Sequence, residues 1–129
     1  MSRISRLFSL WLPVILWAAV IFTLSSIPSL NSGLGTWDLV LRKLAHATEY
    51  ALLAALLLRA LARPWTSFLV ALAYAVSDEF HQHFVRGRAG TPRDAAIDAA
   101  GALIGLAAFS YGRRLFARSI PSRPTCPDD

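Results

Sequence analysis

The sequence has 129 residues, the length of a single domain, and 55% of them are hydrophobic while only 16% are charged. Soluble domains carry about 25% charged residues, so this composition excludes an ordinary soluble domain and favours a chain that has lipid as its solvent. The formal net charge of +5 does not indicate nucleic-acid binding, because the Lys and Arg residues stand in small groups between long apolar runs. The single cysteine, Cys126, excludes a disulfide framework and a Cys-x-x-Cys metal or redox site.

The first predicted element is a membrane helix over residues 7–27. Residues 7–37 carry no charge, and this run exceeds the roughly 20 apolar residues that a helix needs to cross the hydrocarbon core. Pro28 is expected to end the helix. A signal peptide is the alternative, since Arg3 and Arg6 precede the apolar run. That run is too long for a signal peptide, and no Ala-x-Ala cleavage site follows it.

Two further helices follow in the middle of the chain. Thr36 can act as the N-cap of a helix over residues 37–62, after which Pro64 breaks the pattern. Proline suits the first turn of a helix, so Pro64 also predicts the start of a third helix over residues 64–84.

The fourth predicted helix covers residues 92–112. Thr91 is its expected N-cap, Pro92 occupies the first helical position, and Asp94 occupies the third. Residues 113–129 are expected to form a basic end and a disordered tail.

The predicted fold is therefore an all-α integral membrane protein, with a four-helix bundle within residues 1–112. Four crossings place both termini on one side of the membrane. That side carries Arg3, Arg6, Arg59, Arg63, Arg113, Arg114, Arg118 and Arg123, and the other side carries Arg42, Lys43, Arg86, Arg88 and Arg93. The positive-inside rule then predicts that both termini are cytoplasmic.

Acidic residues and histidines gather toward the opposite, outer end of the predicted bundle. At about 1.5 Å per residue, Asp78 lies roughly 22 Å above Arg63, and Asp98 lies roughly 22 Å above Arg113. A charge at this depth costs about 2.5–3.5 kcal/mol, so these groups should face one another or a water-filled space rather than lipid. We therefore expect a polar pocket inside the bundle that opens to the outer face.

The second helix contributes four candidates for this pocket. Lys43, His46 and Tyr50 share one helical face, and Glu49 follows His46 by three residues. Lys43 could instead extend to the headgroups and Tyr50 could belong to the interfacial aromatic belt. His46 and Glu49 could be polar residues packed between helices, or they could be functional.

The third helix contributes Asp78, Glu79 and Gln82. Asp78 and Gln82 share a face, and two adjacent carboxylates in a low-dielectric setting cannot both ionise cheaply. This arrangement suits proton handling or ligand binding, and it equally suits a structural salt-bridge network.

Histidines at the end of the third helix raise the question of a metal. His81 and His83 could bind zinc together with Glu79 or His46, but they project differently from a helix and no His-Glu-x-x-His motif occurs. We therefore expect neither a metal site nor a cofactor.

The loop before the fourth helix and the helix itself complete the candidate set. Arg86 and Arg88 stand beside glycines, which suits recognition of a phosphate or carboxylate, although either arginine could simply anchor the loop at the headgroups. Asp94 is expected to serve mainly at the helix cap. Asp98 lies one turn deeper on a face that continues through Gly101 and Gly105, whose Gly-x-x-x-Gly spacing predicts close approach of another helix rather than a nucleotide loop.

Several of these motifs occur in a characteristic order. They are Lys-x-x-His-x-x-Glu-Tyr at residues 43–50, Ser-Asp-Glu-x-x-Gln at 77–82, Arg-x-Gly near 88 and Asp-x-x-x-Asp-x-x-Gly at 94–101. In this order the chain resembles the VanZ-like family of small bacterial integral membrane proteins, over roughly residues 38–112. The family takes its name from a member associated with resistance to the glycopeptide teicoplanin. The resemblance implies a multi-pass protein of the bacterial inner membrane and does not define a reaction.

The same resemblance assigns a set of ligand-binding positions. These are Lys43, His46, Glu49, Tyr50, Asp78, Glu79, Gln82, Arg88, Asp94 and Asp98. The leading hypothesis is a cell-envelope protein whose outward pocket binds an anionic or amphipathic molecule, such as a lipid-linked cell-wall precursor or a glycopeptide. Membrane lipids are the expected partners, nucleic acid is not, and a homo-oligomer is compatible with the sequence.

A membrane-embedded enzyme acting on a lipid-linked phosphate or pyrophosphate is the alternative hypothesis. His46 or Glu49 would act as general base and Asp78 or Glu79 as acid. Lys43 and Arg88 would hold the phosphate. The sequence offers no clear nucleophile, Ser77 being the nearest candidate. Proton-coupled transport by an oligomer and a purely structural role are further alternatives.

Overall fold

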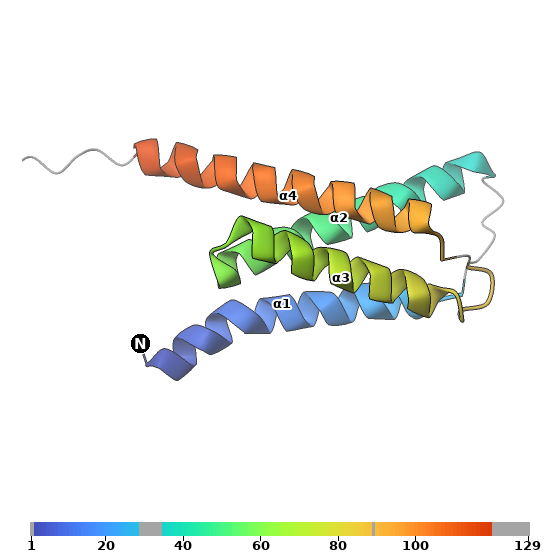
Figure 1. Ribbon diagram of the computed structural model, residues 1–129, viewed down its shortest axis with the longest axis horizontal. Helices are drawn as coiled ribbons and strands as arrows, with labels where there is room; N and C mark the ends of the chain where they lie inside the picture. The colour runs from blue at the N-terminus through green and yellow to red at the C-terminus, as the bar shows by residue number, and fades with distance from the viewer. Residues whose placement is uncertain (1, 29–34, 89, 120–129) are drawn as a thin grey trace, which may run out of the picture.

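The computed structural model describes residues 2–28, 35–88 and 90–119. It confirms an all-α fold with four helices, which are α1 (Arg3–Ser26), α2 (Thr36–Leu61), α3 (Pro64–Gln82) and α4 (Pro92–Ser119). Successive helices run in opposite directions, so the N-terminus lies at the same end of the bundle as the C-terminal end of α4 (Figure 1).

The first and last helices of the chain, α1 and α4, are longer than predicted. α1 begins at Arg3 rather than at residue 7, because Ser2 caps it and its Oγ accepts a 3.2 Å hydrogen bond from the Ser5 N–H. α4 continues to Ser119 rather than ending at residue 112. Residues 113–119 contain neither proline nor glycine, and arginines in the last turns interact favourably with the helix dipole. Most of the tail predicted to be disordered, residues 120–129, lies outside the described residues.

The ends of the two middle helices also differ slightly from the predictions. Gly35, and not Thr36, occupies the N-cap of α2, and no side-chain hydrogen bond caps that end. α2 ends at Leu61, with Ala62 in the left-handed conformation. α3 begins at Pro64 as predicted but ends at Gln82, two residues before the predicted end.

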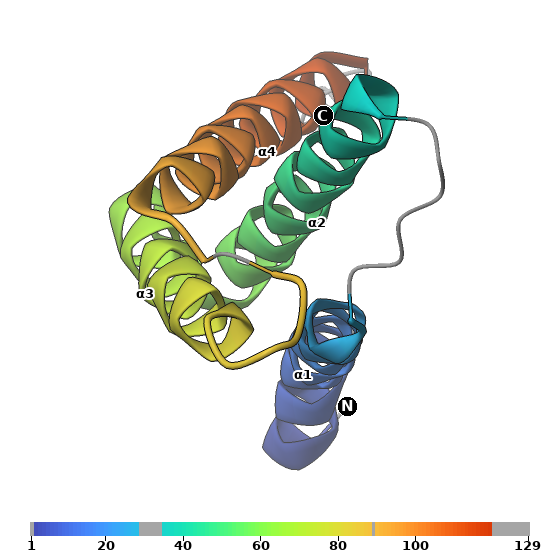
Figure 2. The same ribbon diagram turned by 90° about the vertical axis from the view of Figure 1, so that its right-hand side faces the viewer.

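The closest packing in the bundle is between α2 and α4. A Cβ atom added to Gly101 or Gly105 would collide with the carbonyl oxygen of Ala47 or Ala51 on α2. The two backbones therefore touch directly, as the Gly-x-x-x-Gly spacing predicted. α3 packs beside this pair, and α1 contacts α2 and α3 at the edge of the bundle (Figure 2).

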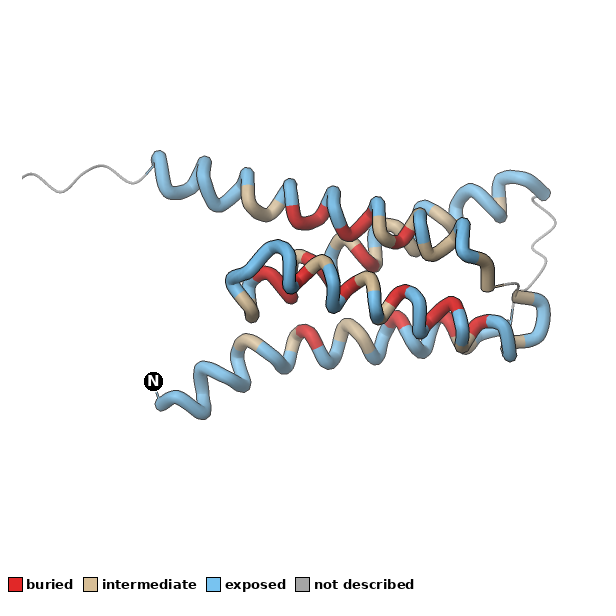
Figure 3. The backbone as a smooth tube through the Cα atoms, in the orientation of Figure 1, coloured by how far each residue is buried: buried red, intermediate tan, exposed pale blue. Residues whose placement is uncertain are grey.

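Buried residues lie along the inward faces of the helices, while the outward faces are exposed and apolar (Figure 3). α1 buries only Val14, Ile21 and Ser25, and its Phe8 and Ile15 are 66% and 61% exposed. An exposed apolar surface of this extent is costly in water and favourable in hydrocarbon.

Three of the described helices, α1, α2 and α4, are long and apolar enough to cross a membrane. α3 is not among them, because its 19 residues include Asp78, Glu79 and Gln82. These polar side chains are buried against neighbouring helices. The fourth crossing thus stays a prediction, supported by the contacts of α3 with all three helices of spanning length.

The contact between α2 and α4 can be tested with alanine substitutions. We expect Gly105→Ala to destabilise the protein by about 1–3 kcal/mol, because the new methyl group forces the two backbones apart. Gly112→Ala is the matched control, since a Cβ at that position meets nothing within 4 Å. Thermal unfolding in detergent measures both variants, and equal melting temperatures would contradict the packing described here.

Candidate functional site

A polar pocket of about 540 Å³ lies where α2 begins, α3 ends and α4 begins. Its lining combines basic, acidic and neutral side chains from the three helices and the α3–α4 loop. The lining residues are Gly35, Asp38, Leu39, Arg42, Lys43, His46, Glu79, Gln82, Gly87, Arg88, Thr91, Arg93, Asp94, Ile97 and Asp98.

An ion pair joins α2 to the first turn of α4 at this pocket. Lys43 Nζ lies 2.8 Å from Asp94 Oδ1. Asp94 Oδ2 accepts a 2.7 Å hydrogen bond from the Thr91 hydroxyl, and the Asp94 N–H donates to Thr91 Oγ1 at 3.3 Å. The predicted cap of α4 is therefore confirmed, and the same carboxylate also holds Lys43.

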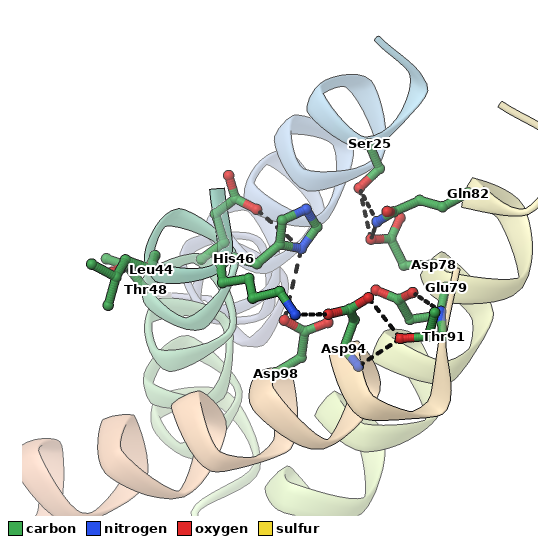
Figure 4. Close-up of polar contacts among 12 residues, drawn as sticks. Ser25, Leu44, His46, Thr48, Asp78, Glu79, Gln82, Thr91, Asp94 and Asp98 are labelled. Atoms are coloured by element: carbon green, nitrogen blue, oxygen red, sulfur yellow. Dashed lines mark hydrogen bonds and ion pairs between the residues drawn. The ribbon is translucent and has the colours of Figure 1, made fainter. Parts of the chain in front are cut away.

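His46 lies deeper, between two carboxylates (Figure 4). Its Nδ1 is 3.7 Å from Asp98 Oδ1 and 3.9 Å from Glu49 Oε2. These distances are too long for hydrogen bonds, which have nitrogen–oxygen separations of about 2.7–3.2 Å. On its other side, Nε2 lies 3.5 Å from Arg88 Nη1. The imidazole is thus surrounded by charged groups from three segments of the chain.

Arg88 connects the pocket to the end of α1. Its guanidinium donates to the carbonyl oxygen of Leu24 at 2.9 Å and to that of Ile27 at 3.1 Å. Helices leave their last carbonyl groups without intrahelical partners, so Arg88 satisfies the end of α1 while it lines the pocket. Burial lowers the pKa of the Arg88 guanidinium from its ordinary value, but arginine remains cationic in proteins.

A buried polar contact holds α1 to α3 beside the pocket. Ser25 Oγ donates a 2.6 Å hydrogen bond to Asp78 Oδ2, and Gln82 Nε2 donates to the same oxygen at 3.0 Å. Gln82 Nε2 also lies 3.3 Å from Ser25 Oγ. All three side chains are buried, so Asp78 is used mainly in joining two helices.

Glu79 fastens the start of α4 to α3. Its Oε2 accepts a 3.0 Å hydrogen bond from the Thr91 N–H. A Cβ on Gly90 would collide with the Glu79 carbonyl oxygen, so glycine permits the loop to pass this close to α3.

Seven of the ten predicted site residues line the pocket. They are Lys43, His46, Glu79, Gln82, Arg88, Asp94 and Asp98. Three do not. Tyr50 is fully buried in the core, Asp78 is bonded to Ser25, and Glu49 lies beside His46 without belonging to the pocket lining.

Other predicted features lie outside the pocket. The Ser77 hydroxyl donates to the Tyr74 carbonyl oxygen on an exposed face, so it is wrongly placed as a nucleophile. His81 Nε2 lies 3.0 Å from Ser26 Oγ, and both His83 and Arg86 are exposed. Neither histidine lines the pocket.

Several residues around the pocket were not predicted from the sequence. Asp38, Arg42 and Arg93 line the pocket, and Ser25 supplies the bond to Asp78. Arg42 and Arg93 directly precede the predicted site residues Lys43 and Asp94, so their positions in the sequence could have indicated that they lie at the pocket. Nothing near Ser25 indicated a partner 53 positions away.

The sequence profile of the VanZ/LLP1 family matches residues 8–116, which includes all the lining residues of the pocket. No curated protein and no solved structure matched the chain.

The Ser25–Asp78 contact yields a prediction about stability. We expect Ser25→Ala to lower the free energy of unfolding by about 1–3 kcal/mol, because it removes a donor from a buried carboxyl group. Ser77→Ala, which removes an exposed hydroxyl, should change stability much less. Melting temperatures in detergent compare the two variants, and a larger effect of Ser77→Ala would count against the buried contact.

Proposed function

Because this chain belongs to the VanZ/LLP1 family, we propose that it is a bacterial cell-envelope protein whose polar pocket binds an anionic or amphipathic molecule. A lipid-linked cell-wall precursor and a glycopeptide are the two candidate ligands. The pocket at one end of the bundle carries this proposal. A connection with teicoplanin resistance is a part of the proposal that follows from the family resemblance alone.

The size and lining of the pocket support binding of a small headgroup. Ligand sites commonly have volumes of about 300–1,000 Å³, a range that includes this pocket of about 540 Å³. Four of its lining residues are the cations Arg42, Lys43, Arg88 and Arg93. Guanidinium groups suit the geometry of phosphate and carboxylate oxygens.

The four cations differ in whether another residue of the chain already binds them. Arg42 pairs with Asp38 at 3.2 Å, Lys43 pairs with Asp94, and Arg88 bonds to α1. Arg93 has no ion-pair partner among the residues that the structure describes, and it is exposed at the pocket. We therefore assign Arg93 as the first contact for an incoming anion.

The apolar outer surface of the helices suits the other half of an amphipathic ligand. Leu39 and Ile97 belong to the pocket lining, and Leu44 of α2 is 59% exposed. A lipid-linked ligand could place its headgroup among the pocket cations while its chain remains in the hydrocarbon.

A membrane-embedded enzyme is the second candidate, and the position of His46 favours it. An imidazole flanked by Asp98 and Glu49 carboxylates can accept and return a proton. With Ser77 outside the pocket, the nucleophile on a lipid-linked pyrophosphate would be water, activated by His46.

We further propose that the protein resides in the inner membrane with both termini in the cytoplasm. The N-terminus and the C-terminal end of α4 lie at the same end of the bundle (Figure 1). The helix ends at that side carry Arg3, Arg6, Arg59, Arg63, Arg113, Arg114 and Arg118, which supports this orientation under the positive-inside rule.

Cysteine labelling tests this orientation. The only cysteine of the chain, Cys126, should remain unlabelled by a membrane-impermeant maleimide in intact spheroplasts. A single cysteine introduced by Arg86→Cys in a Cys126→Ser background should be labelled. Labelling of Cys126 before lysis, or of position 86 only after lysis, would contradict the outward pocket.

Ligand binding can be tested with the purified protein in detergent. We expect native mass spectrometry to detect binding of a polyprenyl phosphate or of teicoplanin. Arg93→Gln should weaken this binding by about 10- to 100-fold, because a hydrogen bond to a charged group contributes about 1.5–3 kcal/mol. Arg86→Gln is the matched control, since Arg86 is exposed outside the pocket.

The outcomes separate the two candidate functions. Equal binding by both variants, or no binding by the natural chain, would contradict the binding proposal. Release of inorganic phosphate from a polyprenyl pyrophosphate, lost in His46→Gln and kept in His83→Gln, would instead establish the enzyme.

A further inference from the structure

Three side chains from three different helices converge at the base of the pocket. His46 of α2, Glu79 of α3 and Asp98 of α4 each offer one nitrogen or oxygen atom, and these atoms all lie within 4.8 Å of one another. We propose that these side chains bind a divalent transition-metal ion of the Zn²⁺ type. The proposal concerns the metal alone and does not require that the pocket bind an envelope molecule.

Buried atoms without partners point to this ion. Asp98 is only 1% exposed, yet its Oδ2 has no hydrogen-bond partner among the described residues. His46 Nδ1, which lies 3.7 Å from Asp98 Oδ1, is also buried without a hydrogen-bond partner. Figure 4 shows the two side chains facing each other. Buried polar atoms are nearly always satisfied in proteins, and a cation bound by both side chains would give each of them a partner.

The local charge balance leads to the same site. Within the described part of the chain, no Lys or Arg forms a salt bridge with Glu49, Glu79 or Asp98. Lys43 is already paired with Asp94. Carboxylates in a low-dielectric interior are stable when they are paired or coordinate a metal, and a divalent cation supplies the positive charge that this group lacks.

The donor atoms select the class of metal. One imidazole nitrogen with two carboxylate oxygens suits Zn²⁺ and its first-row neighbours, whereas Mg²⁺ and Ca²⁺ favour oxygen donors alone. Glu79 uses Oε2 for the Thr91 N–H, which leaves Oε1 for the ion. Three protein donors leave a fourth coordination position for water or for an oxygen of a ligand.

Metal binding would set the tautomer of His46. The nitrogen that binds a metal ion carries no proton, so coordination through Nδ1 would place the ring proton on Nε2. This tautomer excludes a hydrogen bond from Arg88 to Nε2, whose 3.5 Å separation is already longer than the usual range. Arg88 remains held by its bonds to Leu24 and Ile27.

This site differs from the zinc site that was considered and rejected from the sequence, which combined His81 and His83 with Glu79 or His46. His81 approaches Ser26 instead, and His83 is exposed. The converging group consists of residues far apart in the sequence, so no local metal-binding motif could indicate it.

Metal binding to the purified chain tests the proposal. The protein is prepared with a histidine-free affinity tag, stripped with a chelator and titrated with Zn²⁺ in detergent without any added lipid ligand. We expect one Zn²⁺ per chain. Asp98→Asn and His46→Gln should each weaken binding by at least about tenfold, because each removes a ligand. His83→Gln, which changes an exposed histidine outside the pocket, is the matched control and should bind as the natural chain does.

A second measurement needs no variant. Zn²⁺ should raise the melting temperature of the natural chain in a concentration-dependent way, and Mg²⁺ at the same concentration should not. The absence of stoichiometric Zn²⁺ binding, or equal binding by the ligand variants and their control, would overturn the site. Lipid binding measured in the presence of a chelator is read separately, so it can fail or succeed independently of the metal.

Discussion

The direct contact between the backbones of α2 and α4 determines how the rest of the site is arranged. Gly101 and Gly105 lie against the carbonyl groups of Ala47 and Ala51, which fixes both the distance and the register of the two helices. Toward the end of the bundle where α2 and α4 begin, the same register places His46 against Asp98. One turn further along, it places Lys43 against Asp94. A change in this register would therefore displace the ion pair and the buried imidazole together.

The attachment of α1 follows a different physical rule. Lipid chains are as apolar as the helix surface, so the hydrophobic effect gives little reason for a helix to leave lipid for a neighbouring helix. α1 is held instead by hydrogen bonds. The Trp17 indole donates to the Glu49 carbonyl at 2.9 Å, and the Tyr74 hydroxyl donates to the Ala18 carbonyl at 2.7 Å. With the bonds made by Ser25, they form a series of polar contacts along an otherwise apolar helix.

Local signals in the sequence predicted local structure well. The cap at Thr91, the start of α3 at Pro64 and the close approach at Gly101 each depend on a few adjacent residues, and each was correct. The predicted first residue of α1 and the predicted last residue of α4 were wrong because both predictions followed hydrophobicity. A helix continues past the apolar region until a cap or breaker ends it.

Contacts between distant segments could not be predicted in the same way. The cost of burying a charge predicted that the acids would meet at one end, and seven of the ten residues predicted for the site line one pocket. The cost of burying a charge does not indicate which residues bond to one another. Asp78 bonds to a serine 53 positions away, and Arg88 reaches a carbonyl 64 positions away, because helix packing and not sequence spacing brings them together.

Arg88 physically joins the end of α1 to the pocket. A single guanidinium bonds to two carbonyl groups at the end of α1 and also approaches the His46 ring. A ligand that moved the guanidinium away from these carbonyl groups would also weaken the docking of α1. Thermodynamic reciprocity would then require the converse, so a change in how firmly α1 is docked would alter the affinity for that ligand by the same factor. The most peripheral helix of the bundle would thereby contribute to the free energy of binding at the pocket.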